Sequence, residues 1–156
     1  MDEGPPISHR PAAPGEMDGL FDLMMAQTGH YLDEALKVLG ITVDQFTTYF
    51  RSVGQVWAIE IEMDTEVVGF YWIELRAETL HIHGLVLKSE YQNRGLGTAT
   101  MKLIEQCLPQ SVSYIEVGVH ESNAGAQSIC KTFGFTAVRQ QTGTGFTIYQ
   151  KRFGTS

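Results

Sequence analysis

Near its middle the chain carries the pattern of a strand, a glycine-rich turn and a helix in direct succession. The apolar run Leu80–Leu87 predicts the strand, the polar segment 88–94 predicts the turn, and Pro109 ends the helix. Gly95 and Gly97 open that helix, whose first N–H groups have no partner within the helix and lie at the positive end of its dipole. Because glycine has no Cβ, a phosphate can approach this backbone closely. The pattern therefore predicts an anion site.

This turn differs from the two nucleotide-binding loops that have familiar signatures. A dinucleotide-binding turn reads G-x-G-x-x-G directly after a strand, but here Thr100 stands at the third glycine and the strand ends several residues before Gly95. Glu116 stands where such folds carry a ribose-binding acid, which is weak evidence by itself. A Walker loop ends in G-K-[ST], and Gly97-Thr98 lacks the lysine. Both interpretations therefore fit poorly.

Two sequence blocks resemble a different family. The segment Gln92–Gly97 is similar to the Q/R-x-x-G-x-G/A signature of the GCN5-related N-acetyltransferase (GNAT) superfamily. The family's downstream block, N-x-x-A-x-x-L-Y-x-x-x-G-F, is matched in order by Asn123, Ala126, Ile129 and Gly134–Phe135. Cys130 stands where tyrosine is usual. The resemblance covers residues 55–153 well and the first 50 residues only by general layout.

Hydrophobic periodicity predicts the secondary structure around these blocks. Helical spacing occurs at 16–27, at 31–39 and behind a capping box at Thr42–Gln45. A further helix begins at the N-cap candidate Asn123. Period-two patterns, with a hairpin turn at 63–65, predict strands at Ile7–Pro11, Gln55–Glu62, Glu66–Leu75, Leu80–Leu87, Ser113–His120, Thr136–Gln141 and Phe146–Arg152. This order predicts a mixed α+β sheet with helices on both sides.

The length of the chain predicts one domain over residues 1–156, with a loose tail at 1–6. The resemblance to GNAT enzymes implies a central mixed, mostly antiparallel sheet of about six to seven strands flanked by about four helices. In that family the fourth and fifth strands separate, and acetyl-CoA enters the gap. The resemblance places on this cosubstrate Leu85, Val86, Leu87, Gln92, Asn93, Arg94, Gly95, Leu96, Gly97, Thr98, Asn123 and Ala126. The segment 93–98 corresponds to the pyrophosphate loop.

Two histidines are candidates for acid–base chemistry. By strand alternation, His81 and His83 should lie on the same face as Leu85 and Leu87, toward the reaction site. Histidine titrates near neutral pH, which suits a base that takes a proton from an amine. The pair resembles the His-x-His of arylalkylamine N-acetyltransferase, and His81 matches the catalytic glutamate of the histone-acetylating members. The alternative is a structural role within the strand; of the two, His81 is favoured as the base.

Cys130 stands where the family often has a tyrosine that protonates the leaving thiolate. A thiol with an ordinary pKa of about 8.5 can also donate a proton. It could instead form an acyl-enzyme. A free cysteine on an apolar helix face is commonly inert packing, so three roles stay open. Alternative proton donors outside the motif are Tyr91, Tyr114 and Tyr149.

Other polar residues are weaker candidates. Glu74, Glu116 and His120 lie in or beside the central strands and could supply a base through water, although solvated or structural roles are commoner. Gly118 stands where some N-terminal-amine acetyltransferases of the family carry a glutamate base, which disfavours that mechanism. No metal site is predicted, because no cysteine or acid at ligand spacing accompanies the paired histidines.

The composition limits the partners. A chain of 156 residues with 43% apolar and 19% charged residues fits one globular domain. No apolar run is long enough to span a membrane, and the acidic start lacks the apolar core of a secretory signal. Two cysteines make no disulfide framework, so a reducing cytoplasm is the simplest location. The net charge of −7 argues against nucleic acid and mildly favours a cationic partner.

We therefore expect an N-acetyltransferase that moves the acetyl group of acetyl-CoA directly to a primary amine in a ternary complex. Small amines, polyamines, aminoglycosides and peptide or protein lysines all stay open as acceptors, as does a homodimer. The alternative is a non-catalytic acyl-CoA-binding or regulatory module on the same fold. The absence of tyrosine at position 130 favours that alternative, whereas His81 and His83 oppose it.

Overall fold

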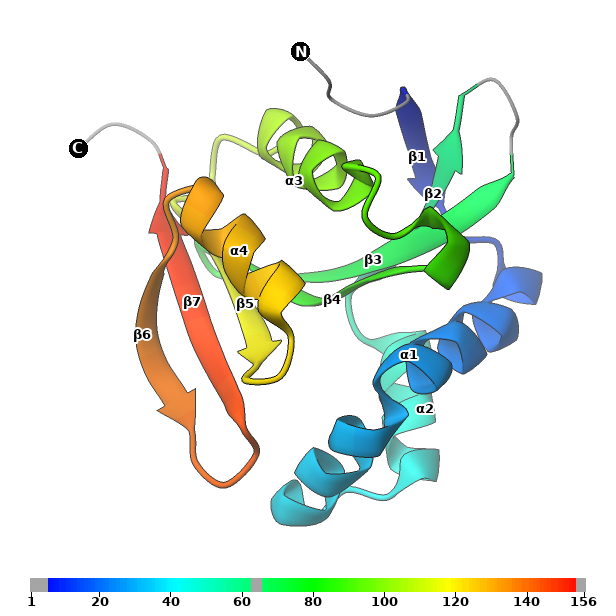
Figure 1. The fold of residues 1–156 in the computed structure, drawn as a ribbon, viewed down its shortest axis with the longest axis vertical. Coiled ribbons are helices and arrows are strands. Elements are labelled where there is room, and N and C mark those ends of the chain that lie inside the picture. Colours follow the sequence, from blue (N-terminus) through cyan, green and yellow to red (C-terminus); the bar gives the residue numbers. More distant parts are fainter. Residues whose placement is uncertain (1–5, 63–65, 154–156) are drawn as a thin grey trace.

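The computed structural model describes residues 6–62 and 66–153, and within them seven strands form one sheet (Figure 1). The strands are β1 (Ile7–Pro11), β2 (Gln55–Ile61), β3 (Val67–Arg76), β4 (Thr79–Leu87), β5 (Tyr114–His120), β6 (Thr136–Gln141) and β7 (Phe146–Arg152). Their order is β1-β2-β3-β4-β5-β7-β6, and all neighbours are antiparallel except β4 and β5. The predicted α+β class is confirmed. The predicted tail at 1–6, apart from Pro6, and the predicted turn at 63–65 lie outside the described residues.

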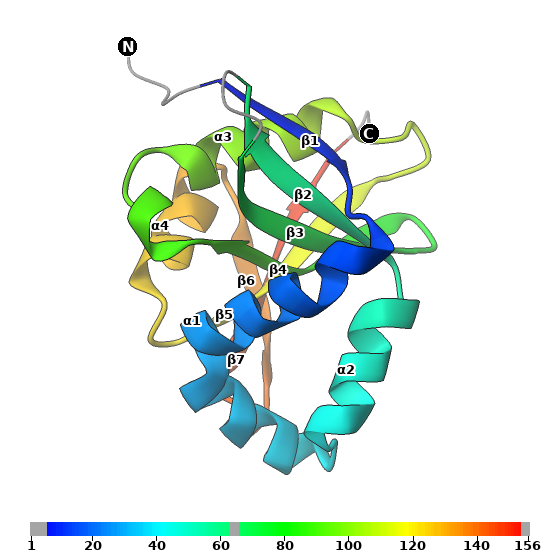
Figure 2. The same cartoon turned by 90° about the vertical axis from the view of Figure 1, so that its right-hand side faces the viewer.

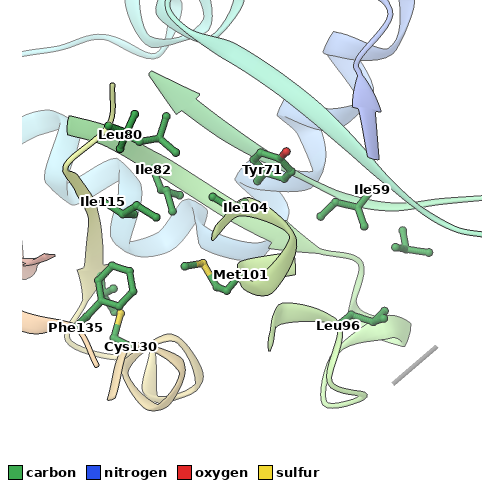
Figure 3. Packing of buried hydrophobic residues seen from close by; sticks show 13 residues of the cluster. Ile59, Tyr71, Leu80, Ile82, Leu96, Met101, Ile104, Ile115, Cys130 and Phe135 are labelled. Atoms are coloured by element: carbon green, nitrogen blue, oxygen red, sulfur yellow. The ribbon is translucent and has the colours of Figure 1, made fainter. Parts of the chain in front are cut away.

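The helices of the described residues cover both faces of the sheet (Figure 2). They are α1 (Met17–Leu39), α2 (Val43–Ser52), α3 (Leu96–Gln106) and α4 (Ala124–Thr132), with short 3-10 turns η1 (Pro14–Glu16) and η2 (Ser89–Tyr91). Between α1, α2 and the sheet lies a cluster that includes Phe50 and Trp72. Between α3, α4 and the other face lies a larger cluster, in which Cys130 sits beside Phe135 (Figure 3). The sheet therefore has two separate apolar faces.

Local capping signals define helix starts as predicted. The Thr42 hydroxyl accepts the Gln45 N–H, and the Gln45 side chain accepts the Thr42 N–H, which completes the capping box of α2. The Asn123 side chain accepts the Ala126 N–H at the start of α4. These bonds satisfy N–H groups that the helices leave without an internal partner.

The two predicted helical segments in the first third form one continuous helix, α1. The Thr28 hydroxyl donates to the Met24 carbonyl and so stays within the helix. Gly29 costs about 1 kcal/mol relative to alanine, which does not end a helix that buries apolar residues on both sides of it. The helix ends at Gly40, as predicted, where φ is 72°. A single rigid element therefore runs along the whole α1/α2 face.

Strands β4 and β5 pair over only part of their length. Their parallel ladder joins Thr79–Ile82 to Tyr114–Val117. Beyond it, β4 stays paired with β3 as far as Leu87, and β5 stays paired with β7 as far as His120. The strands therefore separate after Ile82, as the resemblance implied, and no strand of the described residues pairs with the main-chain edge that each exposes there.

Phe50 packs α2 against the sheet, and replacement of this residue tests that packing. The buried ring lies against Phe70 and Trp72, with centroid distances of 5.7 and 5.0 Å. We expect Phe50→Ala to lower the free energy of unfolding by about 3–5 kcal/mol, because it removes a large buried ring and leaves a cavity. Urea denaturation measures this value. Val43→Ala, at an exposed position of the same helix, should change it by less than about 0.5 kcal/mol. Equal stability of the two variants would contradict the assigned packing.

Candidate active site

The glycine-rich turn leaves the start of α3 open to an anion. Asn93 and Gly95 adopt positive φ angles of 62° and 79°, which turn the chain from η2 into α3. Gly95 is the N-cap and has no side chain to bond the first amide groups of the helix. The Gln92 side chain donates to the carbonyl of Leu87 and to the Gln27 side chain, so the turn is tied to β4 and α1. These features fit the predicted anion site.

A cavity of about 690 Å³, the first cavity, begins at this turn. It extends between α1, α4 and the separating ends of β4 and β5. Most of the residues predicted to bind the cosubstrate line it, namely Leu85, Val86, Leu87, Gln92, Asn93, Gly95, Gly97, Thr98, Asn123 and Ala126. The other two lie elsewhere. Leu96 is buried in the core, and Arg94 places its guanidinium over the Tyr91 ring, 5.6 Å from the centroid.

A β-bulge interrupts β4 at its centre. Ile82 pairs with Ile73 and Gly84 pairs with Trp72, so His83 is an extra residue with no opposite partner in β3. An extra residue shifts the alternation of side chains by one position beyond it. The two halves of β4 therefore present different sets of residues to the same face.

The prediction that both histidines share a face with Leu85 and Leu87 is wrong because of this bulge. The two leucines pack against the cluster under α3 and α4. His83 instead stacks on Trp72 in the cluster under α1 and α2, with a centroid distance of 4.3 Å. The His81 ring meets the His83 ring edge to face at 4.5 Å. The histidines therefore face away from the first cavity, on the α1/α2 side of the sheet.

Each histidine is hydrogen-bonded to a glutamate. His81 Nδ1 donates to Glu116 Oε2 at 2.7 Å, and His83 Nε2 donates to Glu74 Oε1 at 2.8 Å. Because an ionised carboxylate can only accept, these nitrogens carry the protons. A lone pair is left on Nε2 of His81 and on Nδ1 of His83. The carboxylates thus set both the tautomer and the orientation of the rings.

Two arginines complete this network. Arg76 lies 3.0 Å from Glu74 Oε1 and 3.8 Å from Glu116 Oε2, and Arg139 lies 3.5 Å from Glu116 Oε1. Glu116 is only 5% exposed, and a buried carboxylate is strongly destabilising without such partners. Two carboxylates and two guanidinium groups balance each other, so the network is neutral overall when the histidines are uncharged.

Burial keeps the histidines uncharged near neutral pH. It lowers the pKa of His81, and the positive charge of Arg76 acts in the same direction, while the hydrogen bond to Glu116 opposes both without reversing the shift. For His83, burial is again the largest cause, and it lowers the pKa to about 4 against the opposing hydrogen bond to Glu74. Both rings are therefore ready to accept a proton.

A second cavity, of about 850 Å³, lies on the histidine side of the sheet. Its wall comes from the second half of α1, from α2, from the β6–β7 hairpin and from His81 and His83. Ile82 lines both cavities, so they approach each other where β4 and β5 separate. Residues of α1 also line both cavities, since Tyr31 lines the first and Leu32 lines the second. This arrangement can bring two ligands together from opposite faces of the sheet.

Among the described residues, a buried thiol and one tyrosine line the first cavity. Burial raises the pKa of Cys130 to about 11, so it stays a thiol rather than a thiolate near neutral pH. Tyr31, which the sequence did not single out for chemistry, lines the same cavity and stacks on His120 at a centroid distance of 4.0 Å. Burial raises the pKa of Tyr31 as well. The tyrosines considered from the sequence are not in this lining: Tyr91, Tyr114 and Tyr149.

Sequence reasoning missed the network of glutamates and arginines that surrounds the two histidines. Glu74 and Glu116 were considered mainly as solvated or structural groups, and Arg76 and Arg139 were not considered. One signal was present, since Glu74 and Arg76 stand two apart in β3 and share a face. Nothing local brings Arg139 of β6 to Glu116 of β5, because those strands are separated by β7 in the sheet.

Comparison with known proteins agrees with this geometry. A sequence model of the Acetyltransferase (GNAT) family matches residues 18–135, and the chain therefore belongs to that family. No curated protein matches the chain in sequence.

Solved structures share the fold at low sequence identity. Ard1 from Thermoplasma volcanium has a TM-score of 0.72 at 14% identity, covering 96% of this chain and 99% of its own. A GNAT family acetyltransferase from Elizabethkingia anophelis with acetyl-CoA bound has a TM-score of 0.70 at 16% identity, covering 94% and 98%. The ribosomal-protein-S18-alanine N-acetyltransferase from Escherichia coli has a TM-score of 0.68 at 14% identity, covering 97% and 96%. At these identities the likeness concerns the fold alone.

Two further observations concern only residues 6–62 and 66–153. No group of three or more histidine, cysteine, aspartate or glutamate side chains among them is arranged to hold a metal ion. No helix in this part of the chain has the length and apolar character needed to cross a membrane.

An acidic side chain at Gly97 tests the anion site. Gly97→Asp places a carboxylate where the pyrophosphate of CoA is expected, and we expect CoA affinity to fall by about 100-fold or more through charge repulsion and steric exclusion. A Cβ at this position also lies 2.9 Å from Cδ1 of Ile129, so Gly97→Ala is the control for altered packing between α3 and α4. Isothermal titration calorimetry with CoA measures both variants, and circular dichroism checks the fold. Unchanged affinity in Gly97→Asp would contradict the assignment.

Proposed function

We propose that this chain, acting as a single domain, transfers the acetyl group of acetyl-CoA directly to a primary amine. The observation that carries the proposal is the approach of two cavities at Ile82. One begins at a helix N-terminus suited to a pyrophosphate, and the other contains histidines that burial keeps neutral and that carboxylates hold in one tautomer. A thioester in the first cavity and an amine in the second would meet where β4 and β5 separate.

The first cavity fits acetyl-CoA, whose thioester supplies an activated acetyl group. The amides of residues 93–98 would hold the pyrophosphate, since the start of α3 is open there. The β4 edge at Leu85–Leu87 has no partner strand on the β5 side and would bond the pantetheine. Asn123 and Ala126 line the opposite wall. The Elizabethkingia relative, which was solved with acetyl-CoA bound, supports this choice of cosubstrate.

His81 is the proposed base. Its Nδ1 proton is held by Glu116, so the lone pair on Nε2 can accept the proton that the amine loses on attack. The next residue of β4, Ile82, forms with Val117 of β5 the last pair of the ladder before the strands separate. The His81 ring therefore lies beside the place where the two cavities come closest to each other. His83 lines the same cavity and is the alternative base. The Escherichia coli protein of similar fold is named as an N-acetyltransferase of an alanine of ribosomal protein S18, which supports an amine as the acceptor.

Direct transfer is favoured over an acyl-enzyme. An attacking thiolate at Cys130 would need a proton loss that burial opposes, because its pKa is about 11. Tyr31, which lines the first cavity, is the proposed donor of the proton to the leaving thiolate of CoA, and the Cys130 thiol is the alternative donor. The free thiols of Cys107 and Cys130 support a reducing, cytoplasmic setting.

Release of free CoA thiol from acetyl-CoA in the presence of primary amines tests the proposed function. Turnover with at least one amine, above the rate of hydrolysis without amine, is the expected result. The substitution of the usual tyrosine by Cys130 keeps the non-catalytic acyl-CoA-binding module as the second candidate. Tight CoA binding without turnover across a broad panel of amines would favour that module.

Removal of the His81 imidazole tests the base. We expect His81→Gln to lower kcat by about 10²–10⁴-fold with little change in CoA affinity, because glutamine keeps polarity but cannot take the proton. In the unchanged protein, burial lowers the pKa of His81, so the loss of kcat that its protonation causes should occur only on the acid side of about pH 6.5. The comparison uses kcat because kcat/KM also reflects ionisation of the free amine. The variant should lack this acid limb.

His83→Gln is the matched control for that experiment, since it removes the neighbouring ring from the same cavity. It should retain more activity than His81→Gln. The opposite order would reverse the two roles. Full activity in both variants would place the base elsewhere.

Replacement of the buried thiol separates packing from chemistry. We expect Cys130→Ala to lower the free energy of unfolding by about 1 kcal/mol through a small cavity and to leave kcat nearly unchanged. Tyr31→Phe should instead slow turnover by about tenfold or more, since it removes the phenol proton. Urea denaturation and steady-state kinetics measure the two effects. An acetyl adduct on Cys130 that passes to an amine, seen by mass spectrometry, would disprove direct transfer.

A further inference from the structure

The second cavity carries its charge in two arginines. Within the described part of the chain, the charged side chains in its lining are Arg76 and Arg139, and the histidines beside them are neutral. Their side chains are 42% and 58% exposed, so both guanidinium groups retain surface for a ligand. An arginine offers a planar set of five donors, which fits a carboxylate with two parallel hydrogen bonds.

The acidic groups nearby are already engaged. Glu74 bonds to His83 and Arg76, and Glu116 bonds to His81 and lies between the two arginines. Neither glutamate belongs to the lining of the second cavity. A second ammonium group on the acceptor would therefore meet two guanidinium groups and no acceptor carboxylate, which disfavours polyamines.

The rest of the wall is apolar or aromatic. Leu36 and Leu39 come from α1, Phe46 and Tyr49 come from α2, and Trp72 comes from β3. The Trp72 ring contacts both Phe46 and His83, with centroid distances of 5.8 Å and 4.3 Å, and Tyr49 meets His83 edge to face at 5.5 Å. A ligand in this space would bury an apolar or aromatic body against these side chains.

The position of the arginines relative to His81 limits the distance between functional groups of the ligand. His81 approaches one oxygen of Glu116 at 2.7 Å, and Arg76 approaches the same oxygen at 3.8 Å. Arg139 approaches the other oxygen at 3.5 Å. The proposed base and both guanidinium groups therefore surround a single carboxylate. An amine that reaches His81 would bring any group on its own α-carbon close to the arginines.

We infer that the acceptor is a small primary amine with a carboxylate close to the amine and an apolar or aromatic body, as in an aromatic or aliphatic amino acid. This inference rests on the proposed function and adds the class of acceptor. Arg76 and Arg139 take the carboxylate, the α1–α2 wall takes the side chain, and the amine is left beside His81.

Three amines with the same ring test the inference. Phenylalanine, phenylalanine amide and 2-phenylethylamine share the ring and the primary amine, and only the first has a carboxylate. We expect kcat/KM for phenylalanine, at saturating acetyl-CoA, to exceed the other two by at least about tenfold. The amide has the least basic amine of the three, so a preference for phenylalanine over the amide would not reflect a larger neutral fraction, and this comparison decides the test. Equal or better turnover of the two amines without a carboxylate would overturn the inference and leave the proposed function standing.

Arginine variants test whether the preference for a carboxylate on the acceptor arises in this cavity. Arg139→Gln should reduce the ratio of kcat/KM for phenylalanine to that for phenylalanine amide by about fivefold or more. Arg152→Gln makes the same change in charge on β7, outside both cavity linings, and should keep the ratio. An unchanged ratio in Arg139→Gln would contradict the assigned role of Arg139.

A binding measurement separates this inference from the proposed function. Calorimetry with the CoA-loaded protein compares N-acetylphenylalanine with its amide, and requires no turnover. We expect tighter binding of the acid, by about tenfold or more, and a weaker preference in Arg139→Gln. Absence of turnover with every amine would defeat the proposed function, whereas equal or weaker binding of the acid would defeat the inference about the cavity.

Discussion

The incomplete pairing of β4 with β5 is the constraint on which the site depends. The ladder ends at Ile82 and Val117, beyond which each strand keeps an edge without a partner strand. The helix that connects these parallel strands, α3, begins beyond the carboxyl end of β4. The open helix N-terminus and the separation of the strands therefore lie at the same end of the sheet. A full ladder would have satisfied both edges and left no room between them.

A second consequence appears on the other face of the sheet. His81 and Glu116 are paired residues of β4 and β5, and their side chains bond across the strands just before the backbone ladder ends. Glu116 is buried, so it needs that bond together with the two arginines. The same contacts that stabilise the carboxylate hold the imidazole in one tautomer. The hydrogen bond between His81 and Glu116 thus both stabilises the fold and leaves Nε2 of His81 free to accept a proton.

Local features were predictable from the sequence, and long-range features were not. The glycine turn, the capping box at Thr42, the N-cap at Asn123 and most strands follow from short patterns, and the family resemblance supplied the separation of β4 and β5. The bulge at His83 leaves no mark in a period-two pattern, so the faces of both histidines were assigned wrongly. The continuity of α1 was also hidden, because Gly29 weakens the helical pattern without ending the helix. The contact between Arg139 and Glu116 depends on sheet order, which residue spacing does not determine.

The charge of the whole chain is a poor guide to the ligands of these cavities. A net charge of −7 suggested a cationic partner, but at physiological salt charges are screened over about 8 Å. Within that distance, the lining of the second cavity presents Arg76 and Arg139, with Glu74 and Glu116 paired behind them, and the first presents the positive end of the α3 dipole. The remaining acidic residues act at longer range and slow the approach of anions rather than alter their bound state. Ligand choice in this fold therefore follows from the few groups that line each cavity, whatever the sign of the surface as a whole.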